Sequence, residues 1–285
     1  NMVEVEKLGP LIGAEVFGPD ISKELSAEEM TEIETTLAKH AVIVFRNQNI
    51  SPNQQLAFAR RFGSLEINAF DKHALEGHSG ILKVSNIREE DKDVGYADAG
   101  SFWHSDMSYT NTPPRLTMLY ALEIPMRDGK ALGDTLFASA VDAYDALTVK
   151  MKERIQNLKA IHNFSAKKRG VKQPVKLSPE QIATNPPVEH PIARTHPITG
   201  RKSIYVTADE CTGIVGWDAS EALPLLQNLS AHVVEPRFQY RHKWQVGDLL
   251  IWDNCAVQHV VDRDYQFPPD RRMLHRCTVN GSATF

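Results

Sequence analysis

The stretch WHSDMSY at residues 103–109 is the part of this chain that most constrains its fold. It contains a His-x-Asp triplet, His104 and Asp106, and a further histidine, His259, lies near the other end of the sequence. Two imidazoles and one carboxylate on a single ion form the 2-His-1-carboxylate facial triad, which leaves adjacent positions open on Fe(II). A lone His-x-Asp triplet is weak evidence, because such triplets also occur in ordinary turns, so the surrounding sequence has to support the metal site.

The same three residues imply an arrangement of strands. Side chains at i and i+2 of a strand point to one face of a sheet, so we expect one strand to present His104 and Asp106 together. His259 would reach the same ion from a strand distant in sequence, as closure of a jelly roll permits. These three side chains are therefore the predicted metal ligands.

From residue 81 onward the sequence predicts mainly short strands, separated by proline, glycine or Asp-Gly turn signals. The expected strands are 81–84, 116–122, 135–138, 203–206, 238–242, 249–252 and 273–279. Such a pattern is typical of a sandwich or jelly roll rather than of a parallel α/β sheet. The predicted fold class is mainly β with helical inserts (α+β), built around a double-stranded β-helix (jelly-roll) core.

Two helices are predicted ahead of these strands. Ser26 and Glu29 have the spacing of a capping box, in which the serine caps the helix and the glutamate reaches back. A second helix is expected from Ser51, with Pro52 at its first helical position. Helical inserts are expected at 140–158, 179–184 and 220–232.

The length of 285 residues suits one large domain or two small ones. We expect a single domain over residues 1–285. Residues 165–187 are polar, rich in lysine and bounded by prolines, and long irregular segments of this kind are often functional. This stretch is a predicted lid insert.

The bulk composition excludes several classes of partner. A net charge of −4 gives no basic surplus for nucleic acid, and no apolar run approaches the ~20 residues that span a bilayer. The chain has 3 cysteines, in no Cys-x-x-Cys pair, so they cannot form a closed disulfide framework. We therefore expect a reduced, cytoplasmic protein, with Cys255 and Cys277 as buried thiols in strands.

The chain resembles the taurine/dichlorophenoxyacetate dioxygenase (TauD/TfdA-like) family of Fe(II)/2-oxoglutarate-dependent oxygenases. The resemblance runs from about residue 8 to about residue 280 and is carried by an ordered set of stretches. These are FARRFG (58–63), WHSD (103–106), GDT (133–135), RTHP (194–197), WDN (252–254), and His259 followed by Arg272 and Arg276. The resemblance implies iron ligation by His104, Asp106 and His259. Asp253, within WDN, could orient one of these ligands.

The resemblance also implies a site for the co-substrate. An arginine matching Arg272 pairs with the distal carboxylate of 2-oxoglutarate in the family, and a threonine matching Thr135 helps to hold it. A planar guanidinium suits a carboxylate better than the point charge of a lysine does. Arg271 is the competing candidate, because alternation along a strand lets only one of the two arginines face inward. We favour Arg272, since Arg276 then lies on the same face.

Arg276 matches the family arginine that binds the anionic end of the primary substrate. Here the sequence departs from the taurine dioxygenases, because Asn68 and Asp71 stand where those enzymes resemble one another in carrying histidine and tyrosine. Glu210 falls near a phenylalanine of their pocket, whereas Phe164 matches an aromatic wall. Asp71 and Glu210 opposite Arg276 would suit a zwitterion or an amine-bearing acid. Alternatively both acids simply face solvent, as most carboxylates do.

The implied activity is hydroxylation of a small anionic organic substrate, namely a sulfonate, a carboxylate or an amino-acid-like molecule. Fe(II), 2-oxoglutarate and dioxygen take part, succinate and CO2 are released, and the hydroxylated product collapses where its carbon bears a heteroatom. The alternatives are a non-catalytic metal-binding jelly roll or small-molecule sensor, and desaturation or another oxidation on the same scaffold. Family members are commonly dimers or tetramers, so a homo-oligomer is expected.

Overall fold

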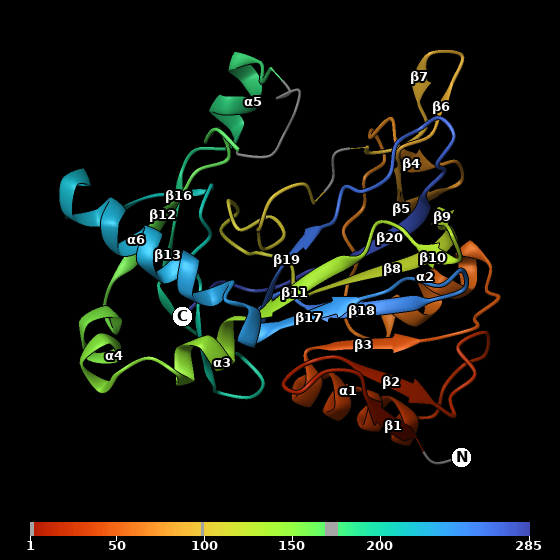
Figure 1. Cartoon of the computed structure of the whole chain (residues 1–285), viewed down its shortest axis with the longest axis horizontal. Coiled ribbons are helices and arrows are strands. Elements are labelled where there is room, and N and C mark those ends of the chain that lie inside the picture. The colour runs from red at the N-terminus through yellow and green to blue at the C-terminus, as the bar shows by residue number, and fades with distance from the viewer. Residues whose placement is uncertain (1–2, 98–99, 169–175) are drawn as a thin grey trace.

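The computed structural model describes residues 3–97, 100–168 and 176–285 (Figure 1). The largest sheet has 8 strands, in the order β1-β2-β3-β18-β8-β20-β5-β4. It contains both the first and the last strand of the described chain. All its pairings are antiparallel except that of β2 with β3. Its strands are β1 (Glu4–Lys7), β2 (Ala14–Phe17), β3 (Val42–Phe45), β4 (Ala74–Leu75), β5 (His78–Ser85), β8 (Leu116–Glu123), β18 (Leu249–Asp253) and β20 (Met273–Val279).

A 3-stranded antiparallel sheet packs against one face of the large sheet. It contains β17 (Gln239–His242), β11 (Thr135–Ser139) and β19 (Val257–Val261), which run beside β8, β18 and β20 in Figure 1. Phe137 of β11 lies in one buried cluster with Leu119 of β8, Trp252 of β18 and Leu274 of β20. The described chain therefore has two packed layers of strands, and the predicted metal ligands come from this region.

Two helices cover the opposite face of the large sheet. They are α1 (Ala27–His40) and α2 (Pro52–Arg60), whose buried residues share a second apolar cluster with β3, β8 and β18. Both predicted helix starts are confirmed: Ser26 and Ser51 each form a complete capping box. A cap of this kind stabilises a helix by about 1 kcal/mol, so the local sequence alone sets where both helices begin.

The helical insert predicted at 140–158 is two helices, α3 (Ala140–Asp145) and α4 (Val149–Ile155). The two helices are separate because Thr148 adopts an extended conformation and its side chain caps α4, accepting a hydrogen bond from Met151 N at 3.1 Å. The predicted inserts at 179–184 and 220–232 correspond to α5 (Pro179–Thr184) and α6 (Ala219–Val233).

Smaller elements complete the structure. A 3-stranded sheet in the order β13-β12-β16 packs with α6 at one end of the molecule (Figure 1). These and the remaining elements are β12 (Lys159–His162), β13 (Val188–Pro191), β14 (Ala193–Thr195), β15 (Lys202–Ile204), β16 (Cys211–Ile214), β6 (Arg88–Glu89), β7 (Lys92–Asp93), β9 (Met126–Arg127), β10 (Lys130–Ala131) and η1 (Pro236–Phe238). The predicted lid at 165–187 falls partly on residues 169–175, outside the described residues.

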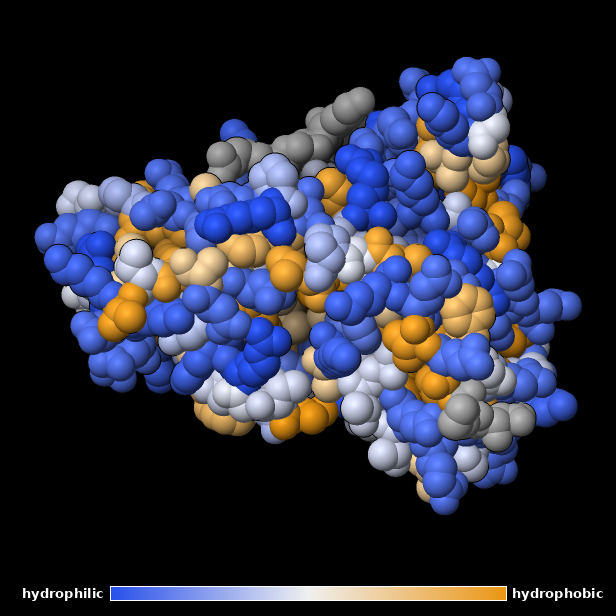
Figure 2. Space-filling view, turned by 60° about the horizontal axis from the view of Figure 1, so that its bottom comes forward, coloured by the Kyte–Doolittle hydropathy of each residue, from blue (hydrophilic) through white to orange (hydrophobic). Residues whose placement is uncertain are grey.

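Apolar side chains are interspersed among hydrophilic ones on the face shown in Figure 2. Among the described helices, none is both long enough and apolar enough to cross a bilayer. Cys211, Cys255 and Cys277 are free and buried, and burial raises the pKa of each thiol to about 12. The prediction that Cys255 lies in a strand was wrong, because it occupies the turn between β18 and β19.

Candidate active site

The three predicted metal ligands meet between the two layers of strands. His104 Nε2 lies 3.2 Å from Asp106 Oδ1, and His259 Nε2 lies 3.6 Å from the same oxygen. The backbones of the two histidines bond reciprocally: His104 N donates to His259 O at 3.1 Å, and His259 N to His104 O at 3.0 Å. This bridge joins segments far apart in sequence and brings the two imidazoles beside one carboxylate.

The expected strand under His104 and Asp106 was wrong. His104 forms an isolated bridge with His259, and Asp106 lies in a turn that continues through Met107, whose φ is 48°. The turn, rather than the alternation of a strand, aims the carboxylate at the imidazoles. His259 does come from a strand, β19.

The hydrogen bonds and charges of the cluster suit a divalent cation. His104 Nδ1 lies 2.7 Å from Phe102 O, so Nδ1 carries a proton and Nε2 is the nitrogen that faces Asp106. Burial alone would lower the pKa of His104, but the hydrogen bond and the charge of Asp106 raise it, so a positive charge is favoured beside Nε2. Burial together with the charge of His104 lowers the pKa of His259 to about 3. Burial alone would raise the pKa of Asp106, but His259 and His104 hold it below its ordinary value. The carboxylate is ionised and His259 is neutral at pH 7, as Fe(II) requires.

A chain of side-chain hydrogen bonds orients the second oxygen of Asp106. Thr117 Oγ1 donates to Asp106 Oδ2 at 2.5 Å, and Asn254 Nδ2 donates to Thr117 Oγ1 at 2.9 Å. Asn254 Oδ1 in turn accepts from Trp252 Nε1 at 3.0 Å. This relay connects two residues of the WDN stretch to the predicted iron ligand through Thr117, which the sequence gave no reason to select.

Asp253, the middle residue of WDN, does not take part in this relay. Its Oδ2 lies 2.6 Å from His196 Nε2, and its Oδ1 accepts from Cys255 N at 2.9 Å. The hypothesis that Asp253 orients a metal ligand was therefore wrong. The two oxygens of Asp253 instead connect His196, within the RTHP stretch, to Cys255 in the turn after β18.

Substituting Thr117 by valine is expected to weaken metal binding by roughly 10- to 100-fold, the range seen when partners of metal ligands are removed. Valine preserves the volume of the side chain but leaves Asp106 Oδ2 without its donor. The dissociation constant for Fe(II) or Co(II), measured by titration of the metal-free protein, checks this expectation. Thr117→Ser retains the hydroxyl and should bind metal within about threefold of the wild-type protein, and equal weakening in both variants would refute the relay.

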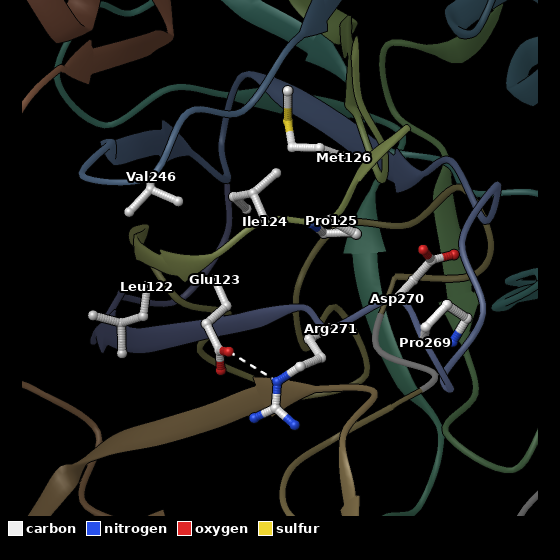
Figure 3. Close-up of a pocket in the computed structure, with 9 residues that line it drawn as sticks. All are labelled: Leu122, Glu123, Ile124, Pro125, Met126, Val246, Pro269, Asp270 and Arg271. Carbon is white, nitrogen blue, oxygen red and sulfur yellow. Dashed lines mark hydrogen bonds and ion pairs between the residues drawn. The ribbon is translucent and has the colours of Figure 1, made fainter. Parts of the chain in front are cut away.

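Arg271 and Arg272, the two residues that precede β20, have side chains in different environments. Arg271 is exposed and its Nε bonds Glu123 Oε1 at 3.0 Å, within a surface pocket that Figure 3 shows. Arg272 is only 2% exposed, and its Nε has no hydrogen-bond partner among the described residues. Of the two candidates for the co-substrate anchor, Arg272 alone lies inside the molecule.

Arg272 is held at a defined position beside Thr135. Its Nη2 donates to Gly133 O at 3.3 Å, and its guanidinium lies 5.6 Å from the centre of the Tyr265 ring. Gly133 has a φ of 76°, and a Cβ there would lie 2.9 Å from Arg272 Nε, so only glycine allows this approach. Thr135 Oγ1 accepts from Trp244 Nε1 at 3.0 Å.

One cavity joins these groups. It is lined by Val84, Gly100, His104, Asp106, Leu119, Thr135, Trp252, His259, Val261, Arg272 and Arg276. The structure thus brings together the predicted metal ligands, both predicted co-substrate residues and the predicted substrate arginine. Within the described part of the chain Arg272 Nε has no hydrogen-bond partner, so it is available to donate to a bound carboxylate.

The model of the family described as "Taurine catabolism dioxygenase TauD, TfdA family" matches residues 4–278. The chain belongs to this family. It is 35% identical over 290 residues to the alpha-ketoglutarate-dependent 2,4-dichlorophenoxyacetate dioxygenase of Burkholderia sp. (strain RASC), covering 98% of this chain and 95% of the relative. It is also 32% identical to the alkylsulfatase of Acinetobacter baylyi, covering 100% of this chain and 87% of that protein.

Solved structures agree with the sequence relatives. The crystal structure of AAD-2 in complex with Mn(II) and N-oxalylglycine has a TM-score of 0.82 and 31% identity, covering 99% of this chain and 98% of that one. A taurine dioxygenase from Burkholderia xenovorans has a TM-score of 0.82 and 26% identity, covering 99% and 90% of the two chains. This TauD/TfdA family member is therefore an enzyme, a dioxygenase that uses Fe(II), 2-oxoglutarate and O2, which confirms the predicted class and cofactors.

The other residues predicted to bind the primary substrate lie outside the lining of this cavity. The Phe164 ring contacts the Tyr109 ring, with ring centres 4.7 Å apart and ring planes tilted by 57°. Both oxygens of Asp71 are occupied, because Oδ1 accepts from His73 N at 2.8 Å and Oδ2 accepts from the Tyr96 hydroxyl. Asn68 is half-buried in the same loop, and its N–H donates to Ser79 O at 2.9 Å.

Glu210 differs from Asp71 in its surroundings. It is 2% exposed, so the interpretation that both acids simply face solvent was wrong for Glu210. Its Oε2 has no hydrogen-bond partner within the described part of the chain. A buried carboxylate of this kind is uncommon enough to require an explanation.

Proposed function

We propose that this dioxygenase hydroxylates a small anionic organic substrate, namely a sulfonate, a carboxylate or an amino-acid-like molecule, and releases succinate and CO2. The observation that carries the proposal is that Arg276 lines the same cavity as the His104, Asp106 and His259 cluster. Its Nε is buried and lacks a partner among the described residues. A guanidinium so placed would hold the anionic end of a substrate beside the metal.

In this proposal each residue has one task. His104, Asp106 and His259 hold Fe(II), which when bound supplies oxidation of a substrate C–H coupled to decarboxylation of 2-oxoglutarate. Arg272 and Thr135 bind the distal carboxylate of that co-substrate.

The apolar walls Val84, Leu119, Trp252 and Val261 exclude water from the cavity that these polar groups share. With water kept out, the charged contacts inside are less screened and therefore stronger.

The names of the relatives support an anionic substrate. They include a 2,4-dichlorophenoxyacetate dioxygenase, a sulfonate dioxygenase of Saccharomyces cerevisiae and a sulfate ester dioxygenase of Pseudomonas putida. These substrates differ in their carbon skeletons, and what they share is an acidic group. We propose the same feature for the substrate of this chain.

The remaining predictions about the assembly are part of the proposal. We infer that the 8-stranded and 3-stranded sheets form the two layers of a jelly roll within a single domain over residues 1–285. We further propose that the protein is cytoplasmic, because its described cysteines are free and buried, as suits a reducing compartment. We also propose that it forms a homo-oligomer. Analytical ultracentrifugation would test the oligomeric state.

The test of the proposed function is succinate release with Fe(II), ascorbate and 2-oxoglutarate against sulfonates, aryloxyacids and amino acids. Stimulation by one class is expected, over a slow uncoupled release without substrate. Arg276→Met should lose roughly 30-fold or more of the kcat/KM for that substrate, as happens when one partner of a buried charge pair is removed. The slow release of succinate without substrate should fall far less in this variant. No succinate under any condition would favour a metal-binding sensor instead.

A further inference from the structure

Trp244 is a buried tryptophan behind the wall of the cavity that contains the predicted co-substrate residues. It follows β17, which pairs with β11 so that His242 lies opposite Thr135 (Figure 1). Its side chain is only 1% exposed and is not part of the cavity lining. The indole N–H donates to Thr135 Oγ1 at 3.0 Å. Any effect of Trp244 on a bound co-substrate would therefore pass through Thr135.

This hydrogen bond restricts the direction in which Thr135 can donate. A threonine hydroxyl has one hydrogen to give and lone pairs with which it accepts. Because the indole N–H occupies a lone pair, the hydroxyl hydrogen has to point away from Trp244. Within the described chain, Thr135 Oγ1 makes no hydrogen bond other than the one from Trp244. Since Thr135 is 1% exposed and lines the cavity, the cavity is where its hydrogen can find an acceptor.

Arg272 supplies a second donor to the same cavity. It belongs to the cavity lining with Thr135, and its Nε has no hydrogen-bond partner among the described residues. A carboxylate can accept from several donors at once, because it has two oxygens and no hydrogen of its own. Donors that are already aimed before the ligand arrives lose less freedom when it binds. The orientation of the Thr135 hydroxyl should thus contribute to the affinity for a carboxylate.

A network of hydrogen bonds around Asp248 holds Trp244 in place. Asp248 Oδ2 lies 3.0 Å from His242 Nε2 and accepts from Gln245 N at 2.9 Å, so one buried carboxylate binds residues on both sides of Trp244 in sequence. Arg46 Nη1 donates to the same oxygen at 2.9 Å. The His242 ring meets the indole edge-on, with ring centres 4.7 Å apart and ring planes at 87°. The indole N–H is therefore aimed at Thr135 by its surroundings.

We propose that Trp244 is a positioning residue, which fixes the Thr135 hydroxyl as a donor to the distal carboxylate of 2-oxoglutarate. The inference rests on the proposed function, in which Arg272 and Thr135 bind that carboxylate. Its consequence concerns selectivity. The preference for 2-oxoglutarate over 2-oxo acids that lack the second carboxylate depends on an indole N–H that does not line the cavity. The competing role is packing alone, because Trp244 also belongs to the apolar cluster between the two layers of strands.

Two ligands that differ only in the distal carboxylate separate these roles. They are N-oxalylglycine and N-methyloxamate, and calorimetry with the Co(II)-loaded protein gives the affinity for each without turnover. The wild-type protein is expected to bind N-oxalylglycine roughly 30-fold or more tightly, since it alone forms the buried charge pair.

Trp244→Phe keeps an aromatic ring but removes the N–H, and it should reduce this affinity ratio by roughly 10-fold, as expected for a hydrogen bond to a charged group. The ratio comes from one preparation, so a smaller folded fraction lowers both measurements alike and does not change it. A reduction of less than about threefold, below the usual effect of such a bond, overturns the proposal.

A second substitution tests whether Trp244 acts through Thr135. Thr135→Val removes the hydroxyl and should itself lower the ratio. In that background Trp244→Phe should change the ratio by less than about threefold, because the effects of residues in one hydrogen-bond network are not additive. A further loss of the full size would show that Trp244 acts by another route, which overturns the proposal.

Trp217→Phe is the matched control, because Trp217 packs against the apolar cluster around α6 and does not line the cavity. Its ratio should equal that of the wild-type protein, and a loss as large as that in Trp244→Phe overturns the proposal. Equal binding of the two ligands by the wild-type protein would overturn the proposed co-substrate site itself. A ratio that falls in Thr135→Val but not in Trp244→Phe would overturn the role of Trp244 alone.

Discussion

Asp106→Ala is expected to reduce Fe(II)-dependent succinate formation to background while leaving the fold intact. Asp106 is the carboxylate that His104 Nε2 and His259 Nε2 approach at 3.2 and 3.6 Å. Its removal leaves two neutral imidazoles, which cannot balance the charge of the metal or hold its third position. Succinate release and a metal titration of the same preparation would measure the loss.

The fold should survive because the backbone bridge between His104 and His259 does not depend on the Asp106 side chain. Removing a buried charge should leave the thermal midpoint of the metal-free protein equal or higher. The rise in midpoint on adding Fe(II) or Co(II), which reflects binding to the native state alone, should disappear. A metal-induced rise of wild-type size in this variant would contradict the assigned ligand set.

Asp253→Ala provides the matched control, since Asp253 is a buried aspartate whose Oδ2 lies 2.6 Å from a histidine nitrogen, His196 Nε2. Asp253 lies outside the metal cluster, and its loss leaves His196 Nε2 without the oxygen that it contacts. The expected result is the reverse of that for Asp106→Ala, namely a lower midpoint of the metal-free protein with the metal-induced rise retained. The pair of variants separates ligation of the ion from stabilisation of the turn.

The sequence was sufficient for those parts of the structure that depend on local signals. Ser26 and Ser51 marked two helix starts, because a capping box is complete within four consecutive residues. The strands with β-branched or apolar runs, such as β8 and β20, were also placed to within a few residues. His104, Asp106 and His259 were identified because their spacing matches a recognised order of motifs.

Contacts between distant segments could not be predicted in the same way. Thr117 lies in the middle of an apolar strand, and only the folded chain places its hydroxyl between Asp106 and Asn254. Glu210 is likewise buried in the folded chain, where its backbone carbonyl accepts from Asn163 N, a residue distant in sequence. The turn at Asp106 follows from tertiary pairing of His104 with His259, which overrides the strand that alternation suggested.

After Asp106→Ala, the largest effect on activity is expected for Arg272→Met, which should raise the KM for 2-oxoglutarate by roughly 30-fold or more. Removing one partner of a buried, hydrogen-bonded charge pair costs about 2–5 kcal/mol, and Arg272 is both buried and unpaired at Nε among the described residues. Methionine fills much of the volume of the side chain, so packing beside Gly133 and Tyr265 is retained. Initial rates over a range of 2-oxoglutarate concentrations would give the KM.

Arg271→Met distinguishes the anchor from its neighbour, because it removes the same charge one residue away. Arg271 is exposed and pairs with Glu123, and a surface ion pair of this kind contributes about 0–1 kcal/mol. Its KM for 2-oxoglutarate should therefore stay near that of the wild-type protein, and the opposite result would transfer the anchor to Arg271. Arg272→Lys should recover little of the loss, since a lysine ammonium cannot reproduce the planar fork that two carboxylate oxygens require. Rescue by lysine would mean that charge alone, rather than the geometry set by Gly133 and Tyr265, holds the co-substrate.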